Sequence, residues 1–332
     1  SREVGDRMLQ LDQYARTTRQ LLRRAWEEHG AWDWYRQLRF SSAYADLRRQ
    51  TGKLDFTDML EEALVEGAPL PLQLAVVDEG QDLTPLQWAV VERLLGGASE
   101  LWVGGDDDQA IHRWAGADVD RLLALGPGGA ATEVLPASWR LPRAVFEVGE
   151  RIAGRLSRRY AKARRPAPRE GAVAWHAEPE AVTLGPGTWL LLARTGAQLG
   201  RLETLARRAG VPYLLRGKPA VVDPAAVRVI QAYEALRAGR VVAWEGVSGV
   251  ANALRVEAPE DARADPRRGF TAVELGLSCD AIWHDALVGL DLDEREFYLA
   301  CLRRGESLTA RPRVRISTIH GAKGQQAHHV LL

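Results

Sequence analysis

The sequence predicts an α/β protein built on parallel sheets, and two apolar runs separated by a helical segment are the main reason. Residues 72–77 form a short, mostly apolar run rich in β-branched side chains, and residues 101–104 form a second one. Both runs end abruptly in acidic residues. Buried parallel strands have this pattern, and doubly wound sheets bind their ligands beyond the carboxyl ends of such strands. The strand–helix–strand order therefore predicts a parallel pair with a site at its carboxyl edge.

The segments around these strands are expected to be helical. Residues 1–66 place apolar side chains at roughly helical spacing between Arg and Glu, and a second amphipathic helix begins near Leu54. Between the two apolar runs, Thr84 is a suitable N-cap and Pro85 suits the first helical position. This helix is expected to continue to about Leu95.

A second α/β domain is expected after the glycine-rich stretch 126–129. Its strands and helices are predicted from short apolar runs and amphipathic segments: strands at 134–135, 189–193 and 314–317, and helices near 142–160, 197–209 and 223–238. Residues 241–311 are less regular, with a polar stretch from Glu257 to Arg268, and we interpret them as an insertion into this domain. His329 opens a last predicted strand.

Composition and charge exclude several classes of protein. The chain has 332 residues, about the length of two domains, and its 44 basic residues balance 44 acidic ones. A uniformly basic coat is excluded, but a local basic groove is not. The basic run at 155–165 either tracks phosphates or forms a solvated helix face. Cys279 and Cys301 are too few for a disulfide scaffold and indicate reduced, cytoplasmic thiols.

Two further classes of site are excluded by the pattern of residues. No apolar run is long enough for a transmembrane helix, so no membrane partner is expected. His328 and His329 have no metal-ligand partners at suitable spacing and are expected to lie in a strand rather than at zinc.

The string Asp78-Glu79-Gly80-Gln81-Asp82 closes the first strand. A carboxylate at a buried strand end can hold Mg²⁺, because this hard cation prefers oxygen ligands. The neighbouring glutamate can then orient and deprotonate a water molecule aimed at a phosphoryl group. An acidic surface turn is the alternative for a bare Asp-Glu pair, but the whole string favours the catalytic interpretation.

A second chemistry-bearing string, Gly-Gly-Asp-Asp-Asp-Gln-Ala-Ile-His-Arg-Trp, occupies residues 104–114. Its three adjacent carboxylates repel one another unless a cation lies near them. Gln109 offers a neutral donor and acceptor that can sense a phosphate or water. Trp114 can stack on a nucleobase, although any one of the 11 tryptophans is more commonly a core residue.

These two strings resemble motifs II and III of the UvrD/Rep-like superfamily 1 DNA helicases, whose pattern is roughly DE-x-QD followed by GDxxQSIYxFRGA. Further blocks follow in the family's order: Leu-Asp-Phe at 54–56, Leu-Pro-Ala-Ser-Trp-Arg-Leu at 135–141 (motif IV), 191–197 with 210–213 and Gly217, and Ser-Thr-Ile-His-Gly-Ala-Lys-Gly at 317–324 (motif V). Because the blocks are ordered and cover about 54–332, the resemblance is specific.

The resemblance implies two RecA-like parallel-sheet domains of the P-loop NTPase type, both incomplete, with helical subdomain material. It places the first domain at 1–127, the second at 128–240 and 312–332, and a reduced accessory insertion at 241–311. It implies a motor that couples Mg-ATP hydrolysis to domain closure and moves 3′ to 5′ on DNA. The implied partners are single-stranded DNA, duplex/single-strand junctions, and DNA repair or DNA replication proteins.

Site residues are implied by their positions in the motifs. Asp78 is implied as the Mg²⁺ ligand, Glu79 as the catalytic base and Arg140 as the side chain that stabilises charge at the γ-phosphate. Gln81 and Gln109 are implied to couple the γ-phosphate to the DNA site. The remaining implied residues contact nucleotide (Asp82, Lys323, Gly324 and Gln326) or DNA (His112, Arg113, Trp114, Thr318 and His320).

Several residues depart from the family pattern. His112 and Ala115 replace a Tyr and an Arg of motif III, and Ser138 replaces the Asn of motif IV. Gln326 stands where the family has a Glu that binds the nucleotide ribose. It offers a hydrogen bond without a charge, which leaves the choice of nucleotide open.

The largest departure concerns the P-loop, G-x-x-x-x-G-K-(S/T), which cradles phosphates with backbone N–H groups and a Lys. The 332 residues contain no such string, since the Gly-Lys pairs at 52–53 and 217–218 lack its other positions, and motif VI is missing too. Either the chain is a fragment of an ATP-driven helicase, or it is a catalytically dead, P-loop-less paralogue that binds DNA or protein. The unfinished last strand and the absence of an initiating Met favour a fragment, and a P-loop upstream of Ser1 would exclude the paralogue.

Overall fold

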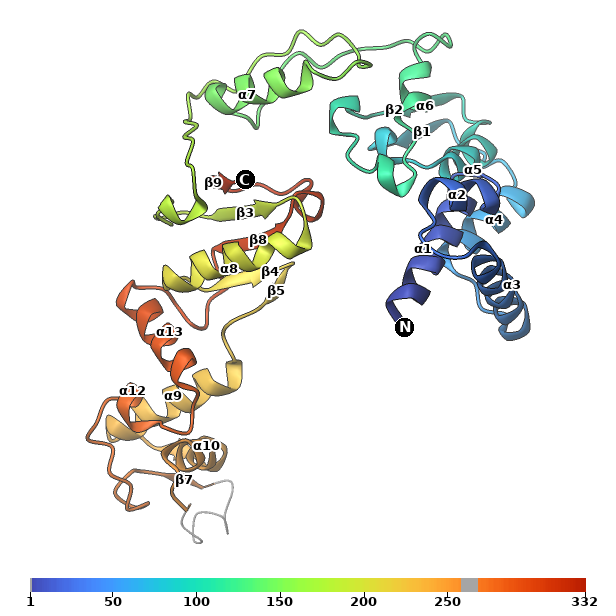
Figure 1. The fold of residues 1–332 in the computed structure, drawn as a ribbon. Coiled ribbons are helices and arrows are strands. Elements are labelled where there is room, and N and C mark those ends of the chain that lie inside the picture. The colour runs from blue at the N-terminus through green and yellow to red at the C-terminus, as the bar shows by residue number, and fades with distance from the viewer. Residues whose placement is uncertain (1, 258–267) are drawn as a thin grey trace. The chain divides into compact units, whose positions relative to one another are not determined.

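The computed structural model describes residues 2–257 and 268–332 (Figure 1). It divides into two compact units, Ser1–Ala174 and Trp175–Leu332, and each is described by itself. Both units contain parallel strands and helices, so the predicted α/β class with parallel sheets is confirmed. The polar stretch predicted from Glu257 to Arg268 lies, apart from its two end residues, outside the described part of the chain.

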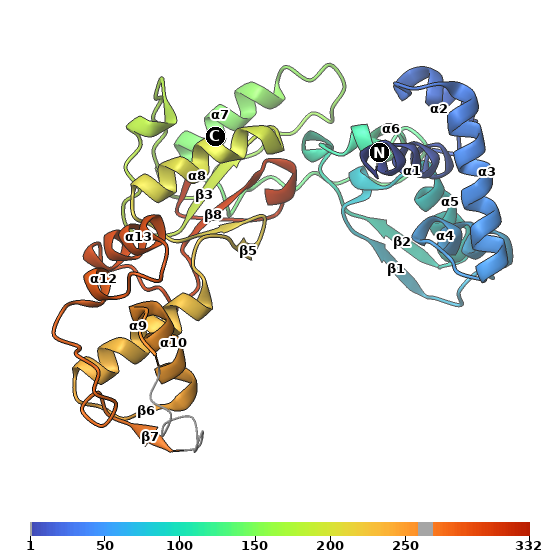
Figure 2. The same ribbon diagram turned by 60° about the horizontal axis from the view of Figure 1, so that its bottom comes forward.

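The first unit begins with the expected helical segment. Its helices are α1 (Arg2–Thr17), α2 (Leu22–His29), α3 (Trp34–Thr51) and α4 (Phe56–Glu66). Asp55 caps α4, and its side chain accepts the backbone N–H of Asp58 at 2.7 Å. Arg16 ties α1 to α4 through ion pairs of 2.9 Å to Asp55 and 2.6 Å to Glu61. These helices gather beside the sheet of this unit (Figure 2).

A two-stranded parallel sheet forms the core of the candidate site region. Strand β1 (Leu74–Val77) pairs in register with β2 (Glu100–Val103). Helix α5 (Pro85–Leu95) connects them, and the Thr84 hydroxyl accepts the N–H of Gln87 as the predicted N-cap. The two strands run in the same direction, so the segments that follow them meet at one edge: the 3₁₀ turns η1 (Gly80–Asp82), η2 (Asp107–Gln109) and η3 (Arg113–Ala115), and then α6 (Val119–Ala124).

Residues 128–174 differ from two predictions. The strand predicted at 134–135 is absent; Leu135 is 77% exposed, and the nearest pairing is an isolated parallel bridge between Ala137 and Arg165. The run is too short to bury both faces, and a proline follows it directly. The helix predicted near 142–160 is shorter: it is α7 (Arg143–Ala153), and Gly154 follows its last residue.

The second unit contains a five-stranded sheet in the order β5-β4-β8-β3-β9. Four strands are parallel, and β5 pairs antiparallel with β4. The strands are β3 (Trp189–Ala193), β4 (Tyr213–Leu215), β5 (Lys218–Pro219), β8 (Val314–Thr318) and β9 (His329–Leu331). The strands predicted at 189–193 and 314–317, and the one opened by His329, are confirmed.

Helices of the second unit share one apolar core with the sheet. They are α8 (Leu199–Arg208), α9 (Pro224–Arg237), α10 (Trp244–Leu254), α12 (Trp283–Ala286) and α13 (Leu292–Arg303), with a small antiparallel pair of β6 (Val242–Ala243) and β7 (Gly269–Phe270). Leu191 and Ile316 of the sheet belong to the same buried cluster as Leu202 of α8 and Tyr233 of α9. The residues expected to form an insertion therefore pack into the core of this unit.

Two further observations concern the chain as a whole. In the ranges that the structure describes, we find no helix with the length and apolar character that a membrane crossing requires. The division between the two units falls after Ala174, whereas the motif pattern places a domain boundary after residue 127. The partition into a first domain, a second domain and an insertion stays a prediction.

Candidate functional site

The end of β1 presents three of the predicted site residues. Asp78 follows the strand directly and is exposed, and its Oδ1 accepts the backbone N–H of Glu79 at 2.9 Å. Glu79 has left-handed backbone angles, φ 54° and ψ 39°, which are uncommon for a residue with a Cβ. This conformation turns the chain into η1, which ends at the half-buried Asp82. Backbone strain of this kind is concentrated at functional sites.

Gln81 joins the ends of the two strands. It is fully buried, donates a hydrogen bond from Nε2 to Glu79, and accepts the backbone N–H of Asp106 at 2.9 Å on Oε1. Gly105 permits this approach, because a Cβ at that position would lie 2.7 Å from Gln81 Oε1. Gln109 in turn donates from Nε2 to Asp106 Oδ2 at 2.7 Å. The structure therefore brings Glu79, Gln81 and Gln109 into one hydrogen-bonded group.

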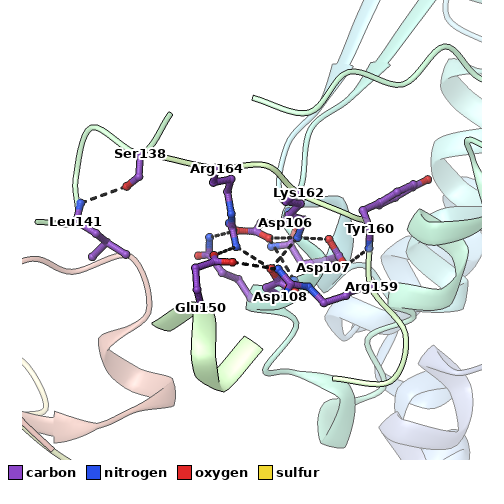
Figure 3. Close-up of polar contacts among 12 residues, drawn as sticks. Asp106, Asp107, Asp108, Ser138, Leu141, Glu150, Arg159, Tyr160, Lys162 and Arg164 are labelled. Carbon is purple, nitrogen blue, oxygen red and sulfur yellow. Dashed lines mark hydrogen bonds and ion pairs between the residues drawn. The ribbon is translucent and has the colours of Figure 1, made fainter. Parts of the chain in front are cut away.

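Cations neutralise the three aspartates that follow β2 (Figure 3). Lys162 Nζ lies 2.6 Å from Asp106 Oδ1 and 3.0 Å from Asp108 Oδ2, and it also contacts Asp107. Arg164 lies 3.1 Å from Asp106 and 2.8 Å from Asp108. The repulsion expected among these carboxylates is thus offset within the same unit.

Three of the six basic residues at 155–165 have neither expected role: they form no solvated helix face, and their partners are carboxylates rather than phosphates. Arg159, Lys162 and Arg164 do not lie on a helix, and their side chains are only 19%, 8% and 21% exposed. Arg159 lies 2.7 Å from Asp108, and Arg164 also pairs with Glu150 of α7 at 2.8 Å. These three cations are committed to carboxylates of the protein rather than to phosphates or solvent.

The cluster shifts the titration of its members. Burial alone would raise the pKa of Asp106, but hydrogen bonds from Lys162 and Gln109 and the charges of Lys162 and Arg164 lower it to about 2. Burial would lower the pKa of Lys162 and of Arg164, yet contacts with the aspartates raise both.

The oxygens of the three aspartates are close enough to hold a metal ion, but the Lys162 ammonium lies among them. Asp78 stays the candidate metal ligand.

The predicted DNA-contacting residues of motif III lie in and beside η3. Trp114 is 69% exposed, so it is not a core residue. Arg113 is exposed and lies 3.4 Å from Asp120 of α6, and the half-buried His112 precedes the turn. A large exposed aromatic side chain at this position is compatible with the predicted stacking role.

Arg140 lies in an exposed loop of motif IV. Its backbone carbonyl accepts a hydrogen bond from Arg169 at 2.6 Å. The Ser138 N–H donates to the Arg165 carbonyl, and the Arg165 N–H donates to the Pro136 carbonyl, both at 2.8 Å. The backbone beside Arg140 is therefore paired with the segment that neutralises the aspartates.

The remaining predicted residues belong to the second unit. Thr318 ends β8, and its hydroxyl accepts a backbone N–H of the following loop at 3.1 Å. His320 opens the 3₁₀ turn η6 (His320–Ala322), and Lys323 and Gly324 follow, the latter with φ 77°. The backbone carbonyl of Gln326 accepts a hydrogen bond from the side chain of Arg315 in β8 at 2.7 Å. Thr318, His320, Lys323 and Gly324 thus lie at the carboxyl end of β8 and in the turn that follows it.

Comparison with known proteins finds similarity to one helicase family model and to several curated proteins. Residues 12–127 match the UvrD/REP helicase N-terminal domain. The RecBCD enzyme subunit RecB of Mycolicibacterium smegmatis is 33% identical over 110 residues, which are 30% of this chain and 10% of RecB. The ATP-dependent DNA helicase UvrD2 of Mycobacterium bovis is 28% identical over 319 residues, 84% of this chain and 45% of UvrD2. The ATP-dependent DNA helicase PcrA of Bacillus subtilis is 28% identical over 136 residues, 37% of this chain and 18% of PcrA.

The matches support a UvrD-like superfamily 1 helicase. The resemblance seen in the motifs is therefore confirmed. This UvrD-like chain spans less than half the length of each of the three relatives. The roles assigned to individual site residues stay predictions.

Sequence reasoning missed the basic partners of motif III in this UvrD-like chain. Lys162 and Arg164 lie more than 50 positions along the chain from the aspartates they contact. A signal was present, because three adjacent carboxylates require cations and the basic run at 155–165 supplies them. Local pattern alone could not choose between carboxylates and phosphates as its partners.

Proposed function

We propose that this chain forms part of an ATP-dependent DNA helicase or translocase that moves 3′ to 5′ on single-stranded DNA. The observation that carries the proposal is the buried Gln81, which hydrogen-bonds to Glu79 on one side and to the backbone of Asp106 on the other. An acidic surface turn does not require a buried amide to orient its carboxylate. A catalytic base whose orientation depends on a second motif does require such an amide.

The geometry of motif II suits phosphoryl transfer. Asp78 fits Mg²⁺, because it is an exposed carboxylate at the end of a strand whose last residue, Val77, is buried. Bound Mg²⁺ would neutralise charge on the phosphates. Glu79 would orient and deprotonate the attacking water, Gln81 would hold the Glu79 carboxylate in place, and Arg140 would stabilise charge at the γ-phosphate.

The remaining parts of the proposal concern domains and substrates. The predicted domains, 1–127 and 128–240 with 312–332, would be the two RecA-like domains, and ATP binding would close one on the other. Trp114 would stack on DNA bases, with Thr318 and His320 near the DNA backbone. The substrates would be single-stranded DNA and its junctions with duplex, and the partners would be repair or replication proteins in the cytoplasm. UvrD2 and PcrA, two of the relatives, are ATP-dependent DNA helicases.

A second candidate function rests on the missing phosphate cradle. The 332 residues contain no P-loop, which fits a catalytically dead paralogue that binds DNA or protein. We place the cradle outside these 332 residues, in the same reading frame. A P-loop encoded upstream would exclude the paralogue.

The test is ATP turnover by the protein encoded by the full reading frame, with and without a single-stranded oligonucleotide. We expect turnover that DNA stimulates and that Glu79→Gln lowers by about 10²- to 10⁴-fold, because the base is lost while the fold is kept. DNA binding without turnover in the wild-type protein would contradict the proposal and favour the binding module.

A further inference from the structure

Residues 159–165, which we call the tie segment, contact residues close to two predicted catalytic groups, Glu79 and Arg140. Its side chains reach the aspartates after β2, and the Arg165 backbone pairs with 136–138 beside Arg140. We propose that Lys162 is a positioning residue that holds motif III against motif II, so that the tie segment couples motif IV to the catalytic base. This inference rests on the proposed ATPase function.

The first step of the coupling is the ion pair that Lys162 makes with Asp106. The Lys162 side chain is 8% exposed, and its Nζ lies 2.6 Å from Asp106 Oδ1. The other oxygen, Oδ2, accepts Gln109 Nε2 at 2.7 Å and lies 3.1 Å from Arg164 Nη1. Both oxygens of the carboxylate are therefore engaged, which fixes its orientation and with it the amide of Gln109.

The second step leads from Asp106 to the base. The Asp106 N–H occupies Oε1 of Gln81 at 2.9 Å, so the amide of Gln81 must present Nε2 to Glu79. Each contact determines the direction of the next. A continuous path of polar contacts runs from Lys162 through Asp106 and Gln81 to Glu79.

The competing explanation is that Lys162 only neutralises buried charge. Lys162 also contacts Asp107, whose side chain is 3% exposed, and Asp108. Asp108 keeps Arg159 and Arg164 as partners when Lys162 is removed. Asp107 accepts the Tyr160 N–H but would lose its lysine, so its charge would destabilise the fold. A test must therefore separate stability from positioning.

The test uses the protein of the full reading frame and three variants. Lys162→Met should lower kcat for DNA-stimulated ATP turnover by about 10- to 100-fold, with KM for ATP changed by no more than about twofold, because misplaced groups act on the chemical step. The double variant Lys162→Met/Asp107→Asn removes the unpaired buried charge and should recover the thermal midpoint but not kcat. Arg158→Met is the matched control, since Arg158 is exposed and pairs with Asp120 outside the path.

A second measurement does not depend on catalysis. Hydrogen exchange of residues 104–111 should be faster in Lys162→Met and in the double variant than in wild type or Arg158→Met, because the Asp106 carboxylate loses its lysine and the Asp106 N–H is then held less firmly against Gln81 Oε1. Recovery of kcat in the double variant would overturn the positioning role, and unchanged exchange would overturn the tie itself. A wild-type protein with no DNA-stimulated turnover would overturn the proposed function instead, and the exchange result would still decide whether the tie exists.

Discussion

The carboxylate of Asp106 stays ionised far below the usual range of an aspartate, and this makes stability depend on pH. Its pKa falls from an ordinary 3.8 to about 2 in the folded chain, against the effect of burial, through Lys162, Gln109 and Arg164. A lowered folded pKa gives stability that is present above the ordinary value and is lost as pH falls towards about 2. We expect this loss to reach about 2 kcal/mol.

Urea unfolding of wild type and Asp106→Asn, measured between about pH 5 and about pH 2, checks this prediction. The wild-type free energy of unfolding should fall more steeply over that range, since only the wild type must protonate this carboxylate. Parallel curves for the two proteins would show that the cluster does not depress the pKa of Asp106.

Trp114 is a second single residue whose role can be separated from the fold. Its side chain is 69% exposed, so removing the indole leaves no cavity in a core. We expect Trp114→Ala to weaken binding of a single-stranded oligonucleotide by about 1–3 kcal/mol, the value of one base–aromatic stack, with the thermal midpoint nearly unchanged. Fluorescence anisotropy and thermal unfolding measure the two quantities. A large fall in the midpoint with unchanged DNA affinity would contradict the stacking role.

At the scale of elements, the site depends on how closely the segment after β2 approaches η1. A Cβ at Gly105 would lie 2.7 Å from Gln81 Oε1 and 2.9 Å from Leu122, whereas one at Gly104 would lie 3.5 Å from Asp78 Oδ1, an ordinary contact. We expect Gly105→Ala to displace Gln81 and to lower kcat for ATP turnover by roughly 10-fold or more.

The neighbouring substitution, Gly104→Ala, is the matched control and should keep most of the activity. Steady-state kinetics of the two variants in the full-length protein decide the point. Equal activity of Gly105→Ala and Gly104→Ala would mean that the buried amide of Gln81 does not orient the base.

Elements with local signals were predictable, and long-range ion pairs were not. The pattern of Thr84 and Pro85 predicted the start of α5, and short runs of apolar or β-branched residues predicted β1, β3 and β8, because caps and periodicity act within a few residues. The motif II and III residues at the carboxyl edge followed from the parallel pairing of the strands. Lys162 could not be assigned, because a basic run has the same local pattern whether it contacts phosphates, water or distant aspartates.

At the scale of the whole molecule, the two units differ in how well they bury apolar surface. The large apolar cluster of the second unit draws on β3, β4, β8, α8, α9, α10 and α13, so it is complete within residues 175–332. In the first unit, the sheet has two strands, and Leu74, Val76 and Trp102 are 53%, 67% and 63% exposed. A two-stranded sheet with an exposed apolar face is marginally stable in water.

We therefore expect residues 175–332, produced alone, to fold with a single cooperative thermal transition, since their core needs no contribution from the first unit. Residues 1–174 alone should unfold at a lower temperature and bind an apolar dye such as ANS more strongly, because the open sheet face stays in contact with water. Differential scanning calorimetry and dye fluorescence on the two separate pieces make the comparison. A first unit that melts cooperatively above the second, without dye binding, would show that its helices α1 to α5 stabilise the sheet enough despite the exposed face.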